Sequence, residues 1–247
     1  MRQTTGVQPT GGVHEPAAST RPPLVSGAAR TPTVILAAMS AAVTALIAAQ
    51  VADHRQPGWL DKAVDDSIRL GREPHDRLLS IVAGLGGPLS VTVIAVIVAG
   101  ACLLTRRYRG AFLVAVAVPA IGLTDIGLKP VIDRTISGYL SYPSGHTMGA
   151  FSLATTIVVL LTGPLHPRLT RRVRVLLAIA AVLAACFVSY SLIVLRMHYF
   201  TDTVGGATLA IAMVLAIALI IDLAAGRWGS AKRREAGGVA PPPAPPA

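Results

Sequence analysis

Cysteine is scarce in this chain of 247 residues, which contains only Cys102 and Cys186. Both lie in long apolar stretches, where a cysteine is usually a small packing residue. Two cysteines in such positions exclude a framework of several disulfides and a cysteine-rich metal cluster. The fold is therefore expected to be stabilised by packing and polar contacts without covalent cross-links.

Charged and aromatic residues are also few. Asp, Glu, Lys and Arg make up 14% of the chain and aromatic residues 4%, whereas apolar residues make up 53%. Soluble domains usually contain about 25% charged residues, so an ordinary soluble domain is not expected. The net charge is +10, but no basic stretch carries the interleaved aromatic residues typical of nucleic-acid binding. No nucleic-acid partner is expected.

The chain contains six long apolar runs with few charged residues. A helix that crosses a bilayer core of about 30 Å needs about 20 apolar residues. The runs lie at residues 33–52, 78–105, 110–128, 147–165, 175–195 and 203–221. A membrane barrel would alternate polar and apolar residues instead. The sequence thus predicts an all-α, multi-pass protein of the cell membrane, with a bundle of six transmembrane helices at residues 33–224 in the lipid bilayer.

The distribution of charge predicts the orientation of this bundle. With a cytoplasmic N-terminus, the inner segments are residues 1–32, 106–109, 166–174 and 222–247. They hold 14 of the 22 basic residues and 3 of the 12 acidic residues. Lys and Arg collect on the cytoplasmic side of membrane proteins. We therefore expect both termini to be cytoplasmic.

The two ends of the chain and one connection have their own compositions. Residues 1–32 are rich in Gly, Pro, Ser and Thr, and residues 225–247 are basic and then Pro-rich, so both are predicted to be disordered cytoplasmic tails. In the connection 59–79, Leu60, Val64 and Ile68 recur every four residues. This spacing predicts a short amphipathic helix on the outer membrane surface, and a solvated connector is the alternative.

The third apolar run contains an ionisable residue near its end. Asp125 lies four residues before Lys129, the favourable order for an ion pair along one helix face. An ionised side chain at the centre of a membrane helix costs about 2.5–3.5 kcal/mol and usually has a partner or a function. We expect Asp125 to orient Lys129 in a supporting role.

Polar side chains of chemical interest concentrate in two segments, 129–146 and 196–202. The 52 residues from His146 to His198 are enough for two membrane spans and a cytoplasmic turn, so both segments are expected on the outer side. The residues that meet at this boundary are predicted to be Lys129, Arg134, Ser144, His146, Arg196, His198 and Asp202.

These residue types suit a phosphate substrate. Lys129, Arg134 and Arg196 can bind phosphate oxygens, and Ser144 and Gly145 precede an apolar helix whose N-terminus favours anions. Two histidines can divide the work of nucleophile and general acid, and Asp202 is placed to orient His198 if a helix continues through both. No third histidine or carboxylate cluster accompanies them, so we expect neither a metal ion nor another cofactor.

The order of these residues resembles the type-2 phosphatidic acid phosphatase family of integral-membrane lipid phosphatases over roughly residues 78–222. The family pattern is Lys-x6-Arg-Pro, then Pro-Ser-Gly-His, then Ser-Arg-x5-His-x3-Asp. The chain carries the second motif in full, and matches the others at Lys129, Ser191, His198 and Asp202. The resemblance implies that His198 attacks phosphorus, that Asp202 supports it and that His146 protonates the leaving oxygen, without a metal.

Two arginines of the family pattern are out of register. The chain has Ile136-Ser137 in place of Arg-Pro and Leu192 in place of the arginine of the third motif. Arg134 lies two positions early, and Arg196 lies one helical turn after Leu192. Our hypothesis is that Arg134 and Arg196 reach the phosphate from these neighbouring positions.

The sequence therefore predicts a lipid phosphate or polyprenyl (pyro)phosphate phosphatase that acts at the extracytoplasmic face through a phosphohistidine. Its partners would be the bilayer and a membrane lipid that carries phosphate or pyrophosphate. Two alternatives stay open at this point. One is a lipid-linked phosphotransferase, and the other is a non-catalytic binder of lipid phosphates. The sequence leaves the oligomeric state undetermined.

Overall fold

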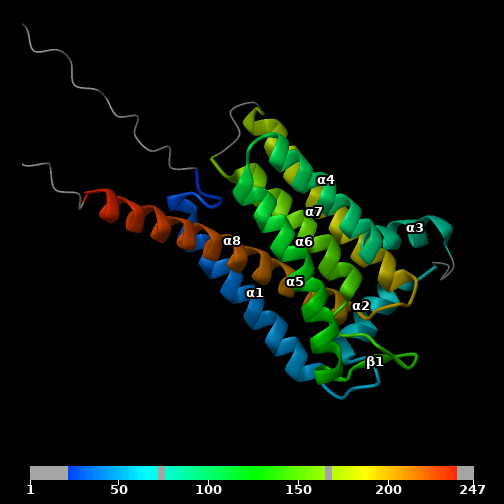
Figure 1. Cartoon of the computed structure of the whole chain (residues 1–247). Helices are drawn as coiled ribbons and strands as arrows, with labels where there is room; N and C mark the ends of the chain where they lie inside the picture. The colour runs from blue at the N-terminus through cyan, green and yellow to red at the C-terminus, as the bar shows by residue number, and fades with distance from the viewer. Residues whose placement is uncertain (1–21, 72–75, 165–168, 238–247) are drawn as a thin grey trace, which may run out of the picture.

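The computed structural model describes residues 22–71, 76–164 and 169–237 of the chain. Nearly all of its regular structure is helical (Figure 1). The helices are η1 (Gly27–Ala29), α1 (Arg30–Val51), α2 (Trp59–Arg69), α3 (Arg77–Leu85), α4 (Pro88–Leu104), α5 (Tyr108–Ile132), α6 (Gly145–Thr162), α7 (Arg171–Val194) and α8 (Phe200–Gly237). Two short strands, β1 (Thr135–Ile136) and β2 (Tyr139–Leu140), pair antiparallel between α5 and α6.

Within the described ranges, five helices are long and apolar enough to cross a membrane: α1, α5, α6, α7 and α8. The second predicted span, 78–105, is not one straight helix but consists of α3 and α4, which meet at an angle of 51°. The break falls at Gly86 and Gly87, after which Pro88 opens α4 at a position where its missing N–H costs nothing. A Cβ on Gly86 would lie 2.5 Å from the carbonyl oxygen of His146, so only glycine allows this approach to α6.

Helix α1 packs as expected for a helix in lipid, with hydroxyl side chains facing the bundle and large apolar side chains facing outward. On α1, Ser40 and Thr44 are buried, whereas Leu46 is 65% exposed. The hydroxyls of Thr44 and Thr208 form a hydrogen bond of 2.8 Å between α1 and α8, which run side by side in Figure 1. Small and hydroxyl side chains allow close helix contacts where lipid removes the hydrophobic drive between helices. The prediction of an all-α membrane bundle is confirmed.

Asp222, in the second half of α8, ties the N-terminal segment to the bundle. Its carboxylate accepts hydrogen bonds from the N–H groups of Leu24 (2.9 Å) and Val25 (2.8 Å) and forms an ion pair with Arg109 (3.1 Å). Leu24 and Val25 are buried in the same core cluster as Leu215. The part of the predicted N-terminal tail from residue 22 is therefore packed against the bundle, because Asp222 satisfies its backbone. Residues 225–237 of the predicted C-terminal tail continue α8 as a helix. Residues 1–21 and 238–247 of the two predicted tails lie outside the described residues.

Replacement of Asp222 with alanine should destabilise the protein. The change leaves Arg109 and two backbone N–H groups without their carboxylate, and breaking a buried ion pair from one side typically costs about 3–5 kcal/mol. We expect the Tm of the detergent-solubilised protein to fall by several degrees, with a smaller fall for Asp222→Asn, which keeps one acceptor oxygen. The matched control is Arg172→Ala, an exposed residue at the start of α7. Equal Tm values for Asp222→Ala and the control would contradict this.

The segments predicted to be cytoplasmic lie together at one end of the bundle. Arg107 donates to the carbonyl of Leu160 (3.4 Å), and Arg174 donates to the carbonyl of Leu161 (3.3 Å), which brings the α4–α5 and α6–α7 connections to the same end. Figure 1 shows η1 and the later part of α8 on this side, and α2 and β1 at the opposite end. The helix bundle thus has two distinct ends, and which end faces the cytoplasm stays a prediction.

Candidate active site

The segment between α5 and α6 places the second motif at the start of a helix. α5 continues through Lys129 to Ile132, and α6 begins at Gly145 with Ser144 as its N-cap. The side chain of Ser144 accepts a hydrogen bond of 3.4 Å from the N–H of Thr147. Because Ser144 can cap the helix and Gly145 can start it, the Pro-Ser-Gly-His sequence forms the helix N-terminus that was expected from the sequence.

The segment between α7 and α8 differs from the expectation of a continuing helix. α7 ends at Val194, Arg196 adopts a left-handed backbone with φ of 58°, and α8 begins only at Phe200. His198 thus precedes the helix and Asp202 lies in its first turn. The Asp202 carboxylate accepts the N–H of Tyr199 at 3.0 Å, which caps the helix, and lies 3.7 Å from Nδ1 of His198. The two side chains meet because the chain turns here, not because they share a helix face.

Backbone contacts join these two segments. The N–H of Ser144 donates to the carbonyl of Asp202 at 3.1 Å, and both residues are fully buried. His146 lies close enough to His198 and Lys129 to interact with them electrostatically. Within the described ranges, Nδ1 of His198 has no hydrogen-bond partner, and 3.7 Å exceeds a hydrogen-bond distance. Catalytic hydrogen bonds are often long before substrate binds. The distance between His198 and Asp202 is therefore compatible with a hydrogen bond that forms when substrate binds.

Asp125 and Lys129 form the predicted ion pair, with 3.1 Å between Oδ2 and Nζ. Asp125 also packs directly against the start of α6, since a Cβ on Gly145 would lie 2.8 Å from the Asp125 carboxylate. Only glycine at position 145 leaves room for this contact. Asp125 therefore holds Lys129 beside the N-terminus of α6.

A cavity of about 790 Å³ extends from this group along α4 and α5. One end is lined by Asp125, Lys129, Gly145 and His146. The walls are apolar and include Val91, Ala95, Val96, Ala99, Val114, Val118 and Ile121. The site is thus a polar corner at the end of an apolar groove.

Comparison with known proteins bears on this arrangement. The PAP2 superfamily matches residues 33–224. The chain belongs to the PAP2 superfamily. Its fold is similar to a solved structure described as "Crystal structure of the first transmembrane PAP2 type phosphatidylglycerolphosphate phosphatase from Bacillus subtilis". The TM-score is 0.62 at 21% identity, over 73% of this chain and 93% of that one.

The family resemblance predicted from the motifs is therefore confirmed. No curated protein matches the chain. At 21% identity the structural similarity shows the fold alone, and the superfamily match carries the assignment. This PAP2 protein is a phosphoric monoester hydrolase of the membrane lipid phosphatase type.

The two displaced arginines of this PAP2 protein occupy different environments. Arg196 is exposed in the turn after α7, so it does not lie on the helix face of Leu192 as predicted, because the helix has already ended. Arg134 is 1% exposed, and its guanidinium binds Asp202, Asp61 and the hydroxyl of Thr201. Neither arginine is among the described residues that line the cavity. The structure thus brings Lys129 and His146 to the cavity, and places Arg134 behind Asp202.

Sequence reasoning missed the contribution of α2 to this site. Leu60, Val64 and Ile68 remain partly exposed, and the buried face of α2 is the acidic one, with Asp61 and Asp65 each 1% exposed. Asp61 accepts the N–H of Thr201 (2.9 Å), and Asp65 accepts the N–H of Phe200 (3.0 Å). The two carboxylates thus satisfy the first N–H groups of α8 and complement its dipole. Their spacing of four residues was the signal available in the sequence.

Asp65 gives the protein a pH-dependent stability. Burial raises its pKa from 3.8 to about 6, and Arg69 at 3.2 Å only partly opposes this. A raised acid pKa means that the folded state binds more protons than the unfolded state between about pH 4 and pH 6. Stability therefore falls as pH rises through this window. We expect the Tm of the wild type to fall relative to that of Asp65→Asn from pH 4 to pH 6, and a constant difference would contradict this.

In the described residues, no group of three His, Cys, Asp or Glu side chains is placed to hold a metal ion. The absence of a cofactor stays a prediction, which the chelator experiment below tests.

Proposed function

We propose that this protein is a metal-independent phosphatase of a membrane lipid phosphate or a polyprenyl (pyro)phosphate, that it acts at the extracytoplasmic face, and that it forms a phosphohistidine. The observation that carries the proposal is the cavity, in which His146 and Lys129 form a polar corner at the end of apolar walls. A substrate with a phosphate head and a hydrocarbon tail fits both parts of this cavity, because the tail can stay in an apolar environment while the head meets Lys129 and His146. His198 is not among the described residues that line the cavity, but it lies close enough to His146 to interact with it electrostatically.

In the first step, His198 attacks phosphorus. Because Nδ1 of His198 faces Asp202, Nε2 is the nitrogen that bonds to phosphorus while the bond from phosphorus to the lipid oxygen breaks. His146 gives its proton to the leaving oxygen, which departs as the lipid alcohol or, from a pyrophosphate, as the lipid monophosphate. Asp202 stabilises the positive charge that His198 acquires.

In the second step, water replaces the lipid. His146, now neutral, takes a proton from water as the water oxygen bonds to phosphorus and the bond to Nε2 of His198 breaks. The products are inorganic phosphate and the regenerated histidine. Lys129 and the N-terminus of α6, at Ser144 and Gly145, provide positive potential for the phosphoryl oxygens in both steps. Arg196 is exposed in the turn two residues before His198 and stays a predicted ligand of the head group.

Phosphate release tests the proposal. The detergent-purified protein is incubated with phosphatidic acid, phosphatidylglycerol phosphate, and polyprenyl phosphate and pyrophosphate in the presence of excess chelator. We expect release from at least one of these lipids, and the ratio of kcat/KM values identifies the preferred class. Failure to release phosphate from every lipid would overturn the proposal, and activity that chelation abolishes would overturn its metal-independent part.

Labelling of single cysteines tests the face of the membrane. After replacement of Cys102 and Cys186, cysteines are introduced at Ser67 in α2 and at Arg172 in α7, both exposed and at opposite ends of the bundle. We expect an impermeant thiol reagent to label position 67 in intact cells and position 172 only after lysis. The reverse pattern would place the site on the cytoplasmic side.

A further inference from the structure

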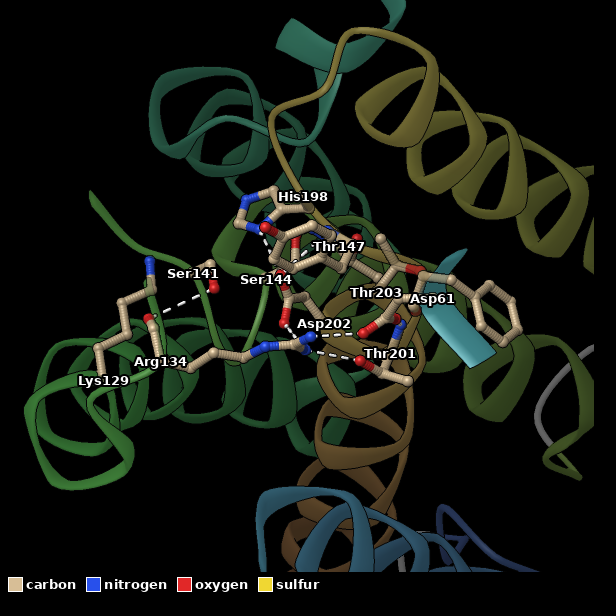
Figure 2. Close-up of polar contacts among 12 residues, drawn as sticks. Asp61, Lys129, Arg134, Ser141, Ser144, Thr147, His198, Thr201, Asp202 and Thr203 are labelled. Carbon is tan, nitrogen blue, oxygen red and sulfur yellow. Dashed lines mark hydrogen bonds and ion pairs between the residues drawn. The ribbon is translucent and has the colours of Figure 1, made fainter. Parts of the chain in front are cut away.

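Arg134 is held in a buried network that reaches from α2 to the histidine of the third motif. Its guanidinium forms ion pairs with Asp61 of α2 and Asp202 of α8, each at 2.5 Å, and donates to the hydroxyl of Thr201 at 2.6 Å. It also stacks on Tyr199, with 4.7 Å from Cζ to the ring centre. Figure 2 shows the side chain running between Asp202 and Asp61. These contacts engage Nη1 and Nη2, whereas Nε has no hydrogen-bond partner among the described residues. Because the side chain is 1% exposed and is not among the described residues that line the cavity, it is not placed to bind substrate phosphate.

The charges in this network determine what His198 experiences. An isolated pair of Arg134 and Asp202 would be neutral, and the carboxylate would then do little to stabilise a positive imidazole. Asp61 adds a second carboxylate to the same guanidinium, so the group of three carries one net negative charge. Because all three side chains are at most 1% exposed, water screens this charge weakly.

Helix α2 also binds the backbone on both sides of the turn that carries His198. Arg69 of α2 donates to the carbonyl of Ile193 at 2.9 Å and to the carbonyl of His198 at 3.4 Å. The charged and titratable groups around His198 therefore come from several elements. They are Asp61, Asp65 and Arg69 of α2, Arg134 after α5, His146 of α6 with Lys129 of α5 behind it, and Tyr199 and Asp202 at the start of α8.

We propose that Asp61 and Arg134 are positioning residues for the reaction. Arg134 holds the Asp202 carboxylate in place, and Asp61 neutralises Arg134 so that the negative charge of Asp202 remains effective at His198. This inference rests on the proposed function of His198 as the nucleophile. It assigns to α2 a role in the chemistry, and it removes Arg134 from the phosphate-binding residues.

The test is the acid limb of the kcat/KM profile, which reports the loss of the proton that blocks His198 as a nucleophile. Asp61→Asn removes a negative charge but keeps an oxygen for the N–H of Thr201, so the limb should move to lower pH by about half a unit or more. Arg134→Gln removes a positive charge, so the limb should move to higher pH. The double variant restores the net charge of the network, and its limb should return close to that of the wild type.

Asp66→Asn is the matched control, because Asp66 is an exposed carboxylate on the same helix. We expect its profile to match the wild type, and we expect Asp61→Asn to lower kcat more than it raises KM. If Arg134→Gln does not fold, the position of the acid limb in Asp61→Asn and in the charge-balanced double variant still tests the inference.

The outcomes separate this inference from the proposed function. A wild type that releases no phosphate overturns the proposed function. An active wild type whose acid limb stays in place in Asp61→Asn overturns the inference alone. An Arg134→Gln variant that loses affinity at unchanged kcat would instead make Arg134 a phosphate ligand.

Discussion

Replacement of His198 with alanine should lower phosphate release from the preferred lipid by at least about 10⁴-fold, the scale of loss when a nucleophile is removed. The reason is that the other nitrogen groups placed near His146 are already engaged: His146 is proposed as the general acid, and Nζ of Lys129 is paired with Asp125 at 3.1 Å. The protein should still fold, because Nδ1 of His198 has no hydrogen-bond partner among the described residues and the neighbouring backbone is held by Arg69 and Asp202. The measurement is single-turnover phosphate release, with Tm as the check on folding.

The control for His198 is a histidine of similar chemistry outside the site. His54 is exposed, and among the described residues its side chain bonds to the carbonyl of Ala52. We expect His54→Ala to retain the activity of the wild type. A second variant, His198→Gly, leaves space for added imidazole, which should restore part of the turnover if His198 is the nucleophile. Full activity of His198→Ala would refute the covalent mechanism.

The phosphoenzyme itself can be trapped. A phosphohistidine is labile in acid and stable in base, so radioactive phosphate from the substrate should remain on the denatured wild-type protein after a base quench and disappear after an acid quench. His198→Ala should carry no label under either condition.

Replacement of His146 with alanine should separate the two steps of the reaction. A lipid alkoxide is a poor leaving group, so its departure needs the proton of His146, and loss of general acid catalysis typically costs about 10²–10⁴-fold. A nitrophenolate leaves without a proton. With a nitrophenyl phosphate, His146→Ala should therefore release one equivalent of nitrophenolate rapidly and then turn over slowly, because the same residue is needed to activate water.

Stopped-flow absorbance measures this burst, and the wild type under the same conditions is the control. The burst should be proportional to enzyme concentration and absent from the double variant with His198→Ala. An equal loss of rate with nitrophenyl phosphate and with lipid phosphate, without a burst, would show that His146 does not act as the general acid.

Local signals in the sequence were sufficient where the structure depends on a few neighbouring residues. Five of the six apolar runs correctly predicted single helices long enough to cross the membrane, because the bilayer requires about 20 apolar residues in a row. The spacing of Asp125 and Lys129 correctly predicted their ion pair. Ser144 and Gly145 correctly marked the start of α6, because an N-cap side chain accepts a hydrogen bond from a backbone N–H only a few residues further along the chain.

Other features depended on residues far apart in the chain. The break between α3 and α4 reflects the approach of Gly86 to the carbonyl of His146, which no local pattern in either helix reveals. The place of Arg134 was predicted from its distance in sequence to Lys129, but its environment is set by Asp61, 73 positions earlier. The apolar spacing in α2 predicted an amphipathic surface helix but not the role of its acidic face. The partners of that face are the N–H groups at the start of α8, which no local pattern in α2 reveals.

The sequence by itself determined that this protein crosses the membrane, that it has the motifs of the PAP2 superfamily, and that two histidines and an aspartate form its candidate centre. Each of these follows from composition or from short spacings along the chain. Only the tertiary structure decided that Arg134 lies behind Asp202, that α2 takes part in the site, and that the polar corner opens into an apolar groove. The physical reason is that buried charges must find partners wherever the fold provides them, and the partners here lie on helices distant in sequence.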